Sequence, residues 1–347
     1  AYTRWEYVDK GFGNAQSLWM VRPDGSGSDH LYKNTIVRPG AMIHVRSIPY
    51  SRAFVTIGVG HHGGLAGPVL ICDTRRNRRD SKAMTNLTPE ISYPGMYPMK
   101  GKGGGRFREP HPFSEKFFLI SHNAPAAGEN GQFGLYALDS WGNRAKLYSD
   151  PKIGCFQPTP LRPRMRPTEI PSVATRYGEW EMGSGEWEVG RAESGKRKAE
   201  DGGSGKSADT GPLAMLFLRD VYQGLTGIER GRVKYIRVME AEILPWEDAF
   251  GAEGGPGMLL SAVSYGADPA IKRIHGIAKV HEDGSAMFTA PAKKNLFFQA
   301  LDENYMELQR MRTFVNLMPG ERRACIGCHE QRRNAPAIQN AHPMAFV

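Results

Sequence analysis

Short apolar runs separated by turn residues recur along the chain. The stretches 54–59, 69–73 and 135–139 are dominated by apolar side chains, and Gly, Pro, Asp or Ser residues bound them. Runs of about four to eight residues with such boundaries predict strands rather than helices. The many glycines and prolines, 41 and 24, agree with frequent turns. We therefore expect a mostly β fold.

An internal repeat organises residues 1–157. Residues 49–57 align with residues 112–120, and both predict a turn followed by a strand. Each copy is followed by an apolar run that an aspartate closes, Asp73 and Asp139. A strand-turn-strand unit recurring at about 50–65 residues is typical of β-propeller blades. We expect a partial β-propeller of about three blades, with the remaining blades lost or on chain outside this sequence.

The pattern changes after the repeat. Residues 158–211 begin with a proline-punctuated run and continue with Gly, Ser, Glu and Lys, so we expect a connector and a flexible insertion. Strands resume at 213–218 and 233–238, and residues 277–288 predict a hairpin through an Asp-Gly turn. We expect residues 212–347 to form a β-sandwich-like domain.

Composition excludes several classes of protein. The formal net charge is +9, but the 45 Lys and Arg residues are scattered among 36 Asp and Glu residues, and no recognition-helix or stacking motif accompanies them. We therefore expect no nucleic-acid partner. No apolar stretch of about 18 residues is present, so we expect no membrane span. Four cysteines are too few for a disulfide framework in 347 residues.

The C-terminal part of the chain carries the most specific motif. Cys325, Cys328 and His329 form C-x-x-C-H, the attachment signature of a c-type haem. Two thiols at this spacing can each bond to one haem vinyl group, and the adjacent imidazole then faces the iron. A zinc ribbon would need a second C-x-x-C, whereas the other cysteines are Cys72 and Cys155. A redox C-x-x-C would normally follow a strand in a βαβ pattern, which is missing.

Further residues could serve this haem. Arg322 and Arg323 precede the motif and could pair with haem propionates, or form a solvated basic collar. His61 and His62 lie on a glycine-flanked loop and could ligate a metal or haem, or could be loop residues satisfied by backbone groups. Other candidates for the sixth iron ligand are His342, Met344, His275 and His281.

At this point the residues resemble a known family. The chain is similar to the middle domain of the hydrazine synthase alpha subunit in five runs that lead to the motif, residues 220–225, 234–240, 282–286, 298–302 and 319–323. The resemblance implies a propeller that precedes a domain carrying haem c, followed in the enzyme by a further c-type haem domain. The present sequence ends about 18 residues after the motif, so that further domain is not part of it.

One position departs from the family pattern. The resemblance implies a tyrosine iron ligand four residues after the motif histidine, with the histidine turned to a zinc ion that a propeller cysteine shares. Arg333 occupies that position here. We therefore expect His329 to be an ordinary proximal iron ligand, and we do not infer hydrazine synthesis. Cys155, at the end of the repeat, is the cysteine candidate for a zinc site, with a buried structural thiol as the alternative.

Two functions are compatible with these features. The first is a c-type haem-binding redox protein, transferring electrons or acting on a small molecule as part of a larger multihaem protein, with a redox partner protein or an additional haem domain. The second is a propeller-based binding or scaffold protein with a structural or sensory haem. Covalent haem is attached outside the bacterial cytoplasm, so both predict a periplasmic or otherwise exported protein. Whether the chain is a haem-dependent oxidoreductase is open.

Overall fold

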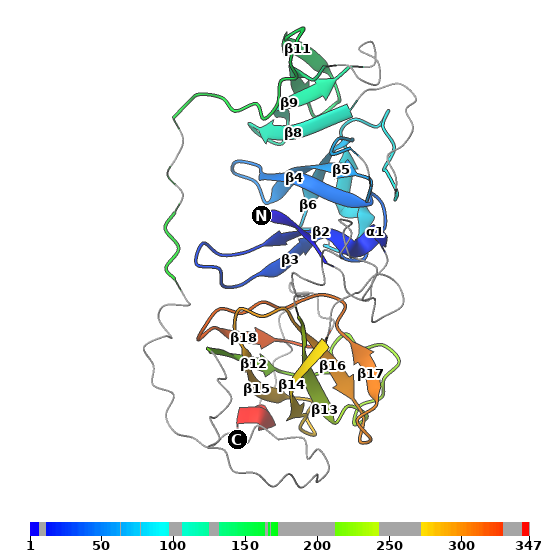
Figure 1. The fold of residues 1–347 in the computed structure, drawn as a ribbon, viewed down its shortest axis with the longest axis vertical. Helices are drawn as coiled ribbons and strands as arrows, with labels where there is room; N and C mark the ends of the chain where they lie inside the picture. Colours follow the sequence, from blue (N-terminus) through cyan, green and yellow to red (C-terminus); the bar gives the residue numbers. More distant parts are fainter. Residues whose placement is uncertain are drawn as a thin grey trace, which may run out of the picture. The chain divides into compact units, whose positions relative to one another are not determined.

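The computed structural model describes residues 1–6, 12–62, 64–76, 78–96, 106–124, 132–163, 166, 168–172, 212–242, 272–328 and 342–346. In these residues the fold is nearly all β, as predicted (Figure 1). The chain divides into two compact units. The first contains residues 1–21 and 29–168, and the second contains residues 22–28 and 169–347.

The described part of the first unit contains three antiparallel meanders (Figure 1). These are the sheets β1-β2-β3, β4-β5-β6-β7 and β8-β9-β10-β11. Their elements are β1 (Tyr2–Trp5), α1 (Phe12–Ala15), β2 (Gln16–Met20), β3 (Asp29–Tyr32), β4 (Ala41–Ser47), β5 (Ala53–Val59), β6 (Val69–Asp73), the 3-10 helix η1 (Ser81–Ala83), β7 (Met84–Asn86), β8 (Arg106–Pro112), β9 (Phe117–Asn123), β10 (Gly134–Asp139) and β11 (Arg144–Tyr148).

The middle meander is buried on both faces. Val55 and Ile57 of β5 belong to a cluster with Phe107 and Ile120 of the third meander, whereas Phe54 packs in a second cluster with residues of the first meander. Every residue of β5 is buried, which explains its uninterrupted apolar sequence. Four-stranded meanders stacked face to face are the arrangement found in propeller blades.

The repeated aspartates terminate corresponding strands. Asp139 ends β10, and its Oδ1 accepts hydrogen bonds of 2.9 Å from the N–H groups of Trp141 and Asn143. Asp73 ends β6, and its Oδ1 accepts one of 2.9 Å from the N–H of Arg75. An aspartate at such a position stabilises the turn that follows a strand. The repeat seen in the sequence is therefore a repeat of strands and turns.

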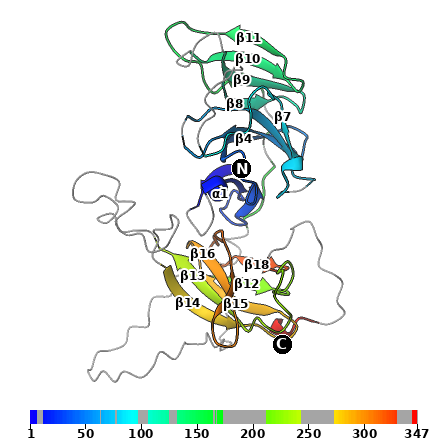
Figure 2. The same cartoon turned by 90° about the vertical axis from the view of Figure 1, so that its right-hand side faces the viewer.

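The described residues of the second unit form two sheets, which are two layers in Figure 2. One is β15-β12-β18 and the other is β14-β13-β16-β17, and β12 and β18 pair in parallel. The elements are β12 (Leu213–Leu218), β13 (Tyr235–Ala241), β14 (Lys272–Lys279), β15 (Ala286–Pro291), β16 (Leu296–Leu301), β17 (Glu307–Arg310), β18 (Arg322–Cys325) and the 3-10 helix η4 (Met344–Phe346). Apolar side chains of both sheets share two clusters, as in a sandwich.

The predicted hairpin at residues 277–288 was wrong. The Asp-Gly turn forms, with Gly284 at φ +85° and a hydrogen bond of 2.8 Å from the His281 N–H to the Ser285 carbonyl. However, β14 pairs with β13 and β15 pairs with β12, so the turn connects the two sheets. An Asp-Gly pair predicts that the chain reverses direction. It does not determine which strands the two flanking strands pair with.

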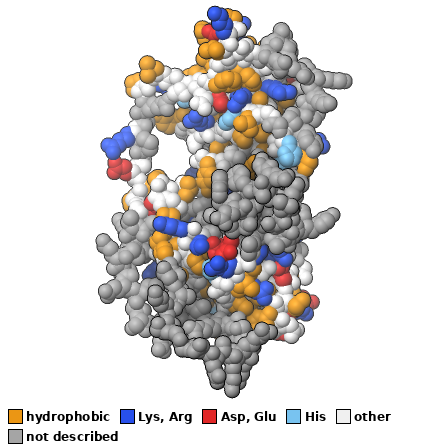
Figure 3. Space-filling view, in the orientation of Figure 1, with side chains coloured by type: hydrophobic (Ala, Val, Ile, Leu, Met, Phe, Trp, Pro, Cys, Tyr) orange, Lys and Arg blue, Asp and Glu red, His pale blue; other side chains and the backbone are white. Residues whose placement is uncertain are grey.

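Charged side chains are interspersed on the molecular face in Figure 3. There the described Lys and Arg side chains alternate with Asp, Glu and apolar side chains. Among the described residues, no helix has the length and apolar character needed to cross a membrane.

Candidate functional site

The two thiols of the C-x-x-C-H motif lie at the end of an edge strand in the second unit. β18 ends at Cys325, which pairs in register with Leu218 of β12. Cys325 and Cys328 are both half-buried thiols. Both pack against an apolar cluster consisting of Leu218, Val221, Val233, Ile236, Val280, Ala286 and Ala300. The two cysteine side chains therefore pack against the same hydrophobic cluster, and each keeps part of its surface accessible to solvent.

Backbone hydrogen bonds hold the motif beyond the end of β18. The N–H groups of Arg219 and Asp220 donate to the carbonyl oxygens of Cys325 and Ile326, at 2.9 and 3.0 Å. The parallel pairing of β12 and β18 is thereby extended into the motif itself. Its first two residues are consequently as firmly placed as the strand that precedes them.

Gly327 is the second intervening residue of the motif. A Cβ atom at this position would overlap the Cβ and the carbonyl oxygen of Gln223. Backbone atoms cannot move aside as the end of a flexible side chain can. The close approach of the two chain segments therefore requires glycine between Ile326 and Cys328.

Asp220 anchors the segment that faces the motif. Its carboxylate is 4% exposed, and Oδ2 accepts a hydrogen bond of 2.6 Å from Nη2 of Arg230. Gly284 lies directly against this carboxylate, because a Cβ there would overlap Oδ1. The Val221 N–H donates to the Gly284 carbonyl at 2.8 Å. The Asp-Gly turn at residues 282–285 is thus packed onto the segment that holds the motif.

Tyr222, in the segment 220–225 that faces the motif, fixes this segment to residues 231–233. Its hydroxyl accepts hydrogen bonds from the N–H groups of Gly231, at 2.7 Å, and Val233, at 3.0 Å, and donates to the Val233 carbonyl at 3.3 Å. The guanidinium of Arg230 lies 4.9 Å from the centre of the tyrosine ring. The hydrogen bond from Arg230 to Asp220 raises the pKa of the guanidinium. A buried carboxylate, a cation and an aromatic ring thus support the motif from one side.

The two arginines before the motif differ in environment. Arg323 is 8% exposed, and its Nη2 binds Oε1 of the buried Glu321 at 2.9 Å while its Nη1 donates to the Ser28 carbonyl at 3.0 Å. Glu321 Oε1 also accepts the N–H of Gly27 at 3.1 Å. Arg322 is exposed. Contact with haem propionates stays a prediction for both, and Arg322 is the one whose side chain lies at the surface.

His329 and Arg333 lie outside the described residues. The proximal ligand and the departure from the family pattern therefore rest on the sequence. Among the residues described, no group of three or more His, Cys, Asp or Glu side chains could hold a metal ion. This finding does not extend to groups that include His329.

His61 and His62 form a small aromatic group with Trp5. The ring centres of His61 and His62 are 4.5 Å apart, and those of Trp5 and His61 are 5.3 Å apart. The backbone N–H groups of the two histidines donate to the carbonyls of Gly95, at 3.2 Å, and Met96, at 2.7 Å. The structure thus brings the two predicted residues together on a loop with backbone support, and a metal role for them stays a prediction.

The other candidate iron ligands occupy separate places in the second unit. His275 Nε2 lies 2.7 Å from Oε2 of the buried Glu240, so this imidazole is engaged in an ion pair or hydrogen bond. His281 is at the start of the Asp-Gly turn. His342 and Met344 belong to the C-terminal turn, where both are exposed.

The sequence did not reveal a connected set of strained residues in the first unit. His44, Glu109 and Gln157 have φ values of +55°, +53° and +53°. The Glu109 N–H donates to Nδ1 of His44 at 3.3 Å, and the Gln157 N–H donates to Oε2 of Glu109 at 2.6 Å. A signal was present, since residues 109–112 and 157–160 share the pattern Glu/Gln-Pro-x-Pro.

Cys155 takes its place within this pattern. It precedes Gln157 by two positions, as Phe107 precedes Glu109. Its N–H donates to the Phe133 carbonyl at 2.7 Å, and its side chain is half-buried. In the repeat, Cys155 therefore corresponds to Phe107, which lies in β8, the first strand of the third meander. A zinc role for Cys155 stays a prediction.

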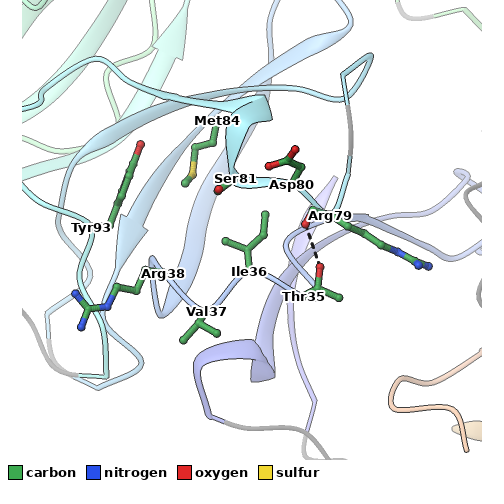
Figure 4. Close-up of a pocket in the computed structure, with 9 residues that line it drawn as sticks. All are labelled: Thr35, Ile36, Val37, Arg38, Arg79, Asp80, Ser81, Met84 and Tyr93. Carbon is green, nitrogen blue, oxygen red and sulfur yellow. Dashed lines mark hydrogen bonds between the residues drawn. The ribbon is translucent and has the colours of Figure 1, made fainter. Parts of the chain in front are cut away.

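An open hollow in the first unit lies apart from these residues. Figure 4 shows Ile36 between Met84 and Val37, with the side chains of Arg38 and Arg79 extending away on opposite sides. Thr35, Asp80, Ser81 and Tyr93 complete the lining. No predicted site residue contributes to it, so the candidate site remains the thiol pair of the second unit.

The comparisons with known proteins include the part of the chain that carries the motif. The family model of the hydrazine synthase alpha subunit middle domain matches residues 231–330. Over this range the chain is a relative of that subunit. The matched range includes β13 to β18 and the whole C-x-x-C-H motif. The resemblance inferred from the sequence is thereby confirmed.

A solved structure extends the similarity in fold. "Kuenenia stuttgartiensis Hydrazine Synthase" matches with a TM-score of 0.69 at 18% sequence identity, covering 99% of this chain and 43% of that chain. The hydrazine synthase alpha-like chain thus spans less than half of the length of that protein. A search of the curated proteins gives no match.

Proposed function

We propose that this hydrazine synthase alpha-like chain binds haem c through Cys325 and Cys328, with His329 as the proximal iron ligand. The observation that carries the proposal is that both half-buried thiols, at and just after the end of β18, pack against one apolar cluster. Attachment adds each S–H across one vinyl double bond, so that a C–S bond forms and the hydrogen moves to the vinyl group. No oxidant is required for this step.

The described residues fit such a group. A haem ring is large and mostly apolar, and the half-buried Cys325 and Cys328 both pack against apolar side chains. Arg322 is an exposed residue of the strand that ends at Cys325, and its guanidinium is the one that we propose to pair with a propionate. Haem c would supply an iron that changes between ferric and ferrous states. The protein residues would fix its position and restrict the approach of water.

We infer that the protein is an exported redox protein within a larger multihaem protein. It would transfer electrons to a redox partner or a further haem domain, or act on a small molecule. The family match over residues 231–330 supports a redox role, and the 43% coverage of the solved relative leaves room for additional domains. Hydrazine synthesis is not part of the proposal, because Arg333 stands where the resemblance implies a tyrosine.

Covalent attachment is tested by expressing the chain with a periplasmic haem-maturation system. A pyridine haemochrome spectrum and the intact mass should show one covalent haem. Cys325→Ala and Cys328→Ala should each lose one thioether bond, and the double variant should carry no covalent haem. Cys155→Ala, which removes a half-buried thiol outside the motif, is the matched control and should retain it. Covalent haem in the double variant would refute the proposal.

A spectroelectrochemical titration separates the redox role from a scaffold with a structural haem. We expect reversible reduction and oxidation with one electron per haem. A covalent haem that cannot be cycled reversibly would favour the scaffold function.

A further inference from the structure

A hydrogen bond between two strained residues connects the middle and third meanders of the first unit. The Glu109 N–H of β8 donates to Nδ1 of His44 in β4 at 3.3 Å, and the two strands are neighbours in Figure 1. Both residues have positive φ, a conformation that persists only where neighbours stabilise it. Because a backbone N–H can only donate, the ring nitrogen must carry a lone pair. The contact therefore requires a neutral imidazole with its hydrogen on Nε2.

The surroundings of the His44 ring determine how readily it takes up a proton. Burial lowers the pKa of His44, and the guanidinium groups of Arg108 and Arg46 act in the same direction. The carboxylate of Glu109 opposes them, with its Oε1 3.9 Å from Nε2 of His44. Nη2 of Arg108 lies 3.6 Å from the same oxygen, so a cation already balances part of that charge. The net result is a lowered pKa, which favours the neutral ring that the contact requires.

His122 of β9 shows the opposite arrangement. Its Nδ1 lies 3.1 Å from the carbonyl oxygen of Arg106, and a carbonyl oxygen can only accept. This ring nitrogen therefore carries a hydrogen, and protonation of Nε2 would leave the bond in place. Of these two histidines, His44 is the one whose contact is lost when the ring is protonated.

The same contact bears on the segment that follows the third meander. Oε2 of Glu109 accepts the N–H of Gln157 at 2.6 Å, and Gln157 also has positive φ. The bond to His44 restrains the backbone of residue 109, and the side chain of residue 109 restrains residue 157. Loss of the first bond should therefore loosen both positions.

We propose that the hydrogen bond from Glu109 to His44 is a pH-sensitive junction between the two meanders, closed when His44 is neutral and opened when Nδ1 is protonated. Protonation replaces the acceptor by a second donor, so the Glu109 N–H loses this partner. For a histidine whose folded pKa is lowered, the stabilisation is complete above the unfolded value of about 6.5 and is lost as the pH falls below it. The junction should thus open before carboxyl groups with ordinary pKa values of about 4 titrate. The inference is independent of haem attachment.

Hydrogen exchange followed by mass spectrometry tests the junction locally. Exchange rates of peptides that contain Glu109 or Gln157 are measured between about pH 8 and pH 5 and divided by those of the unfolded chain at the same pH. The wild type should lose most of the protection of these peptides as the pH falls below about 6.5. His44→Asn is the matched variant, because asparagine tolerates positive φ and offers an oxygen acceptor that does not titrate. It should keep its protection over the whole range.

A second variant tests the electrostatic balance at the ring. Glu109→Gln removes the charge that favours the imidazolium, so the pH at which the junction opens should move downward. An upward movement would overturn the proposal. So would wild-type protection that stays constant or increases down to about pH 5, or a loss of protection in His44→Asn that matches the wild type.

Nuclear magnetic resonance of the wild type provides a measurement that needs no variant to fold. The amide resonance of Glu109 and the ring resonances of His44 should change with one shared midpoint, below about pH 6.5. Two different midpoints would show that the Glu109 N–H does not respond to the His44 proton, and the proposal would be wrong.

Discussion

Gly327 illustrates a constraint that a motif of spaced cysteines does not express. The two residues between the cysteines are formally arbitrary, yet here the second of them faces the backbone of Gln223. The thiols are therefore positioned by the packing of the motif against residues 220–225 as well as by their spacing.

Replacement of Gly327 by alanine should weaken both the fold and haem attachment. The added Cβ must displace the Gln223 backbone, and overpacking of this kind costs about 1–3 kcal/mol in free energy of unfolding. We expect a lower midpoint in urea unfolding and a smaller yield of covalent haem. Gly64→Ala is the control, because the nearest atom to its Cβ would be 3.7 Å away in the Arg106 side chain. A Gly327→Ala protein as stable as the control would contradict the close approach.

At the residue scale, the sequence marks candidate residues more readily than it marks their contacts. Cys325 and Cys328 were recognisable because their spacing is itself the signal. The contacts of Asp220 with Arg230 and with Gly284 were not predictable, because contacts between distant segments leave no local pattern. The ion pair of Arg323 with the buried Glu321 was not predictable either, because a strand pattern does not show which arginine has a buried partner.

At the scale of elements, β4 and β8, the first strands of two successive meanders, each contain a bulge, and a hydrogen bond connects the two bulges. The register of β4 shifts around His44 and that of β8 shifts around Glu109, and both residues have positive φ. Each side chain accepts the N–H of the corresponding residue in the next repeat. Burial lowers the pKa of His44 and outweighs the opposing effect of Glu109. The lowered pKa favours the neutral imidazole, whose Nδ1 can accept a hydrogen bond. Strained backbone persists only where neighbours stabilise it, and here the bulges stabilise one another.

Removal of the middle carboxylate should loosen the next repeat. In Glu109→Ala the Gln157 N–H loses its acceptor, and a lost hydrogen bond to a charged group costs about 1.5–3 kcal/mol. Hydrogen exchange followed by mass spectrometry should show faster exchange in peptides that contain Gln157. Glu109→Gln keeps an acceptor oxygen and should exchange nearly as slowly as the wild type. Equal exchange rates in the two variants would show that the carboxylate does not hold this segment.

The strands themselves were largely predictable, and their pairing was not. Residues 213–218 and 296–301 were expected as strands and are β12 and β16. The second predicted strand begins at Tyr235 rather than Val233. The turn at 282–285 forms, but its strands join different sheets, because pairing depends on β12 and β13, which lie far from the turn in sequence.

At the scale of the whole molecule, each unit has its own core. The described buried clusters of the first unit contain no member of the second, and the converse holds for the clusters built around Leu216 and Leu218. Separate cores allow separate unfolding transitions. A substitution in one unit should then change the stability of that unit alone.

Glu240 offers a test through pH. Burial raises its pKa, but hydrogen bonds from Lys294, at 3.0 Å, and His275, at 2.7 Å, outweigh burial and the pKa is lowered. A carboxyl whose folded pKa is depressed stabilises the fold above its unfolded pKa of about 4.3, and this contribution is lost as the pH falls through the folded value. The stability difference between wild type and Glu240→Gln should therefore be largest above about pH 4.5 and shrink on further acidification.

Calorimetric unfolding between about pH 3 and pH 6 measures this difference, with the exposed Glu303→Gln as the control that should show none. Because Glu240 lies within the second unit, its replacement should move only one transition, and Glu109→Ala should move the other. Two variants that shift the same transition would mean that the units unfold together. In that case the segment that carries Cys325 and Cys328 would unfold together with the meanders of the first unit, and a substitution near the motif would change the stability of both units.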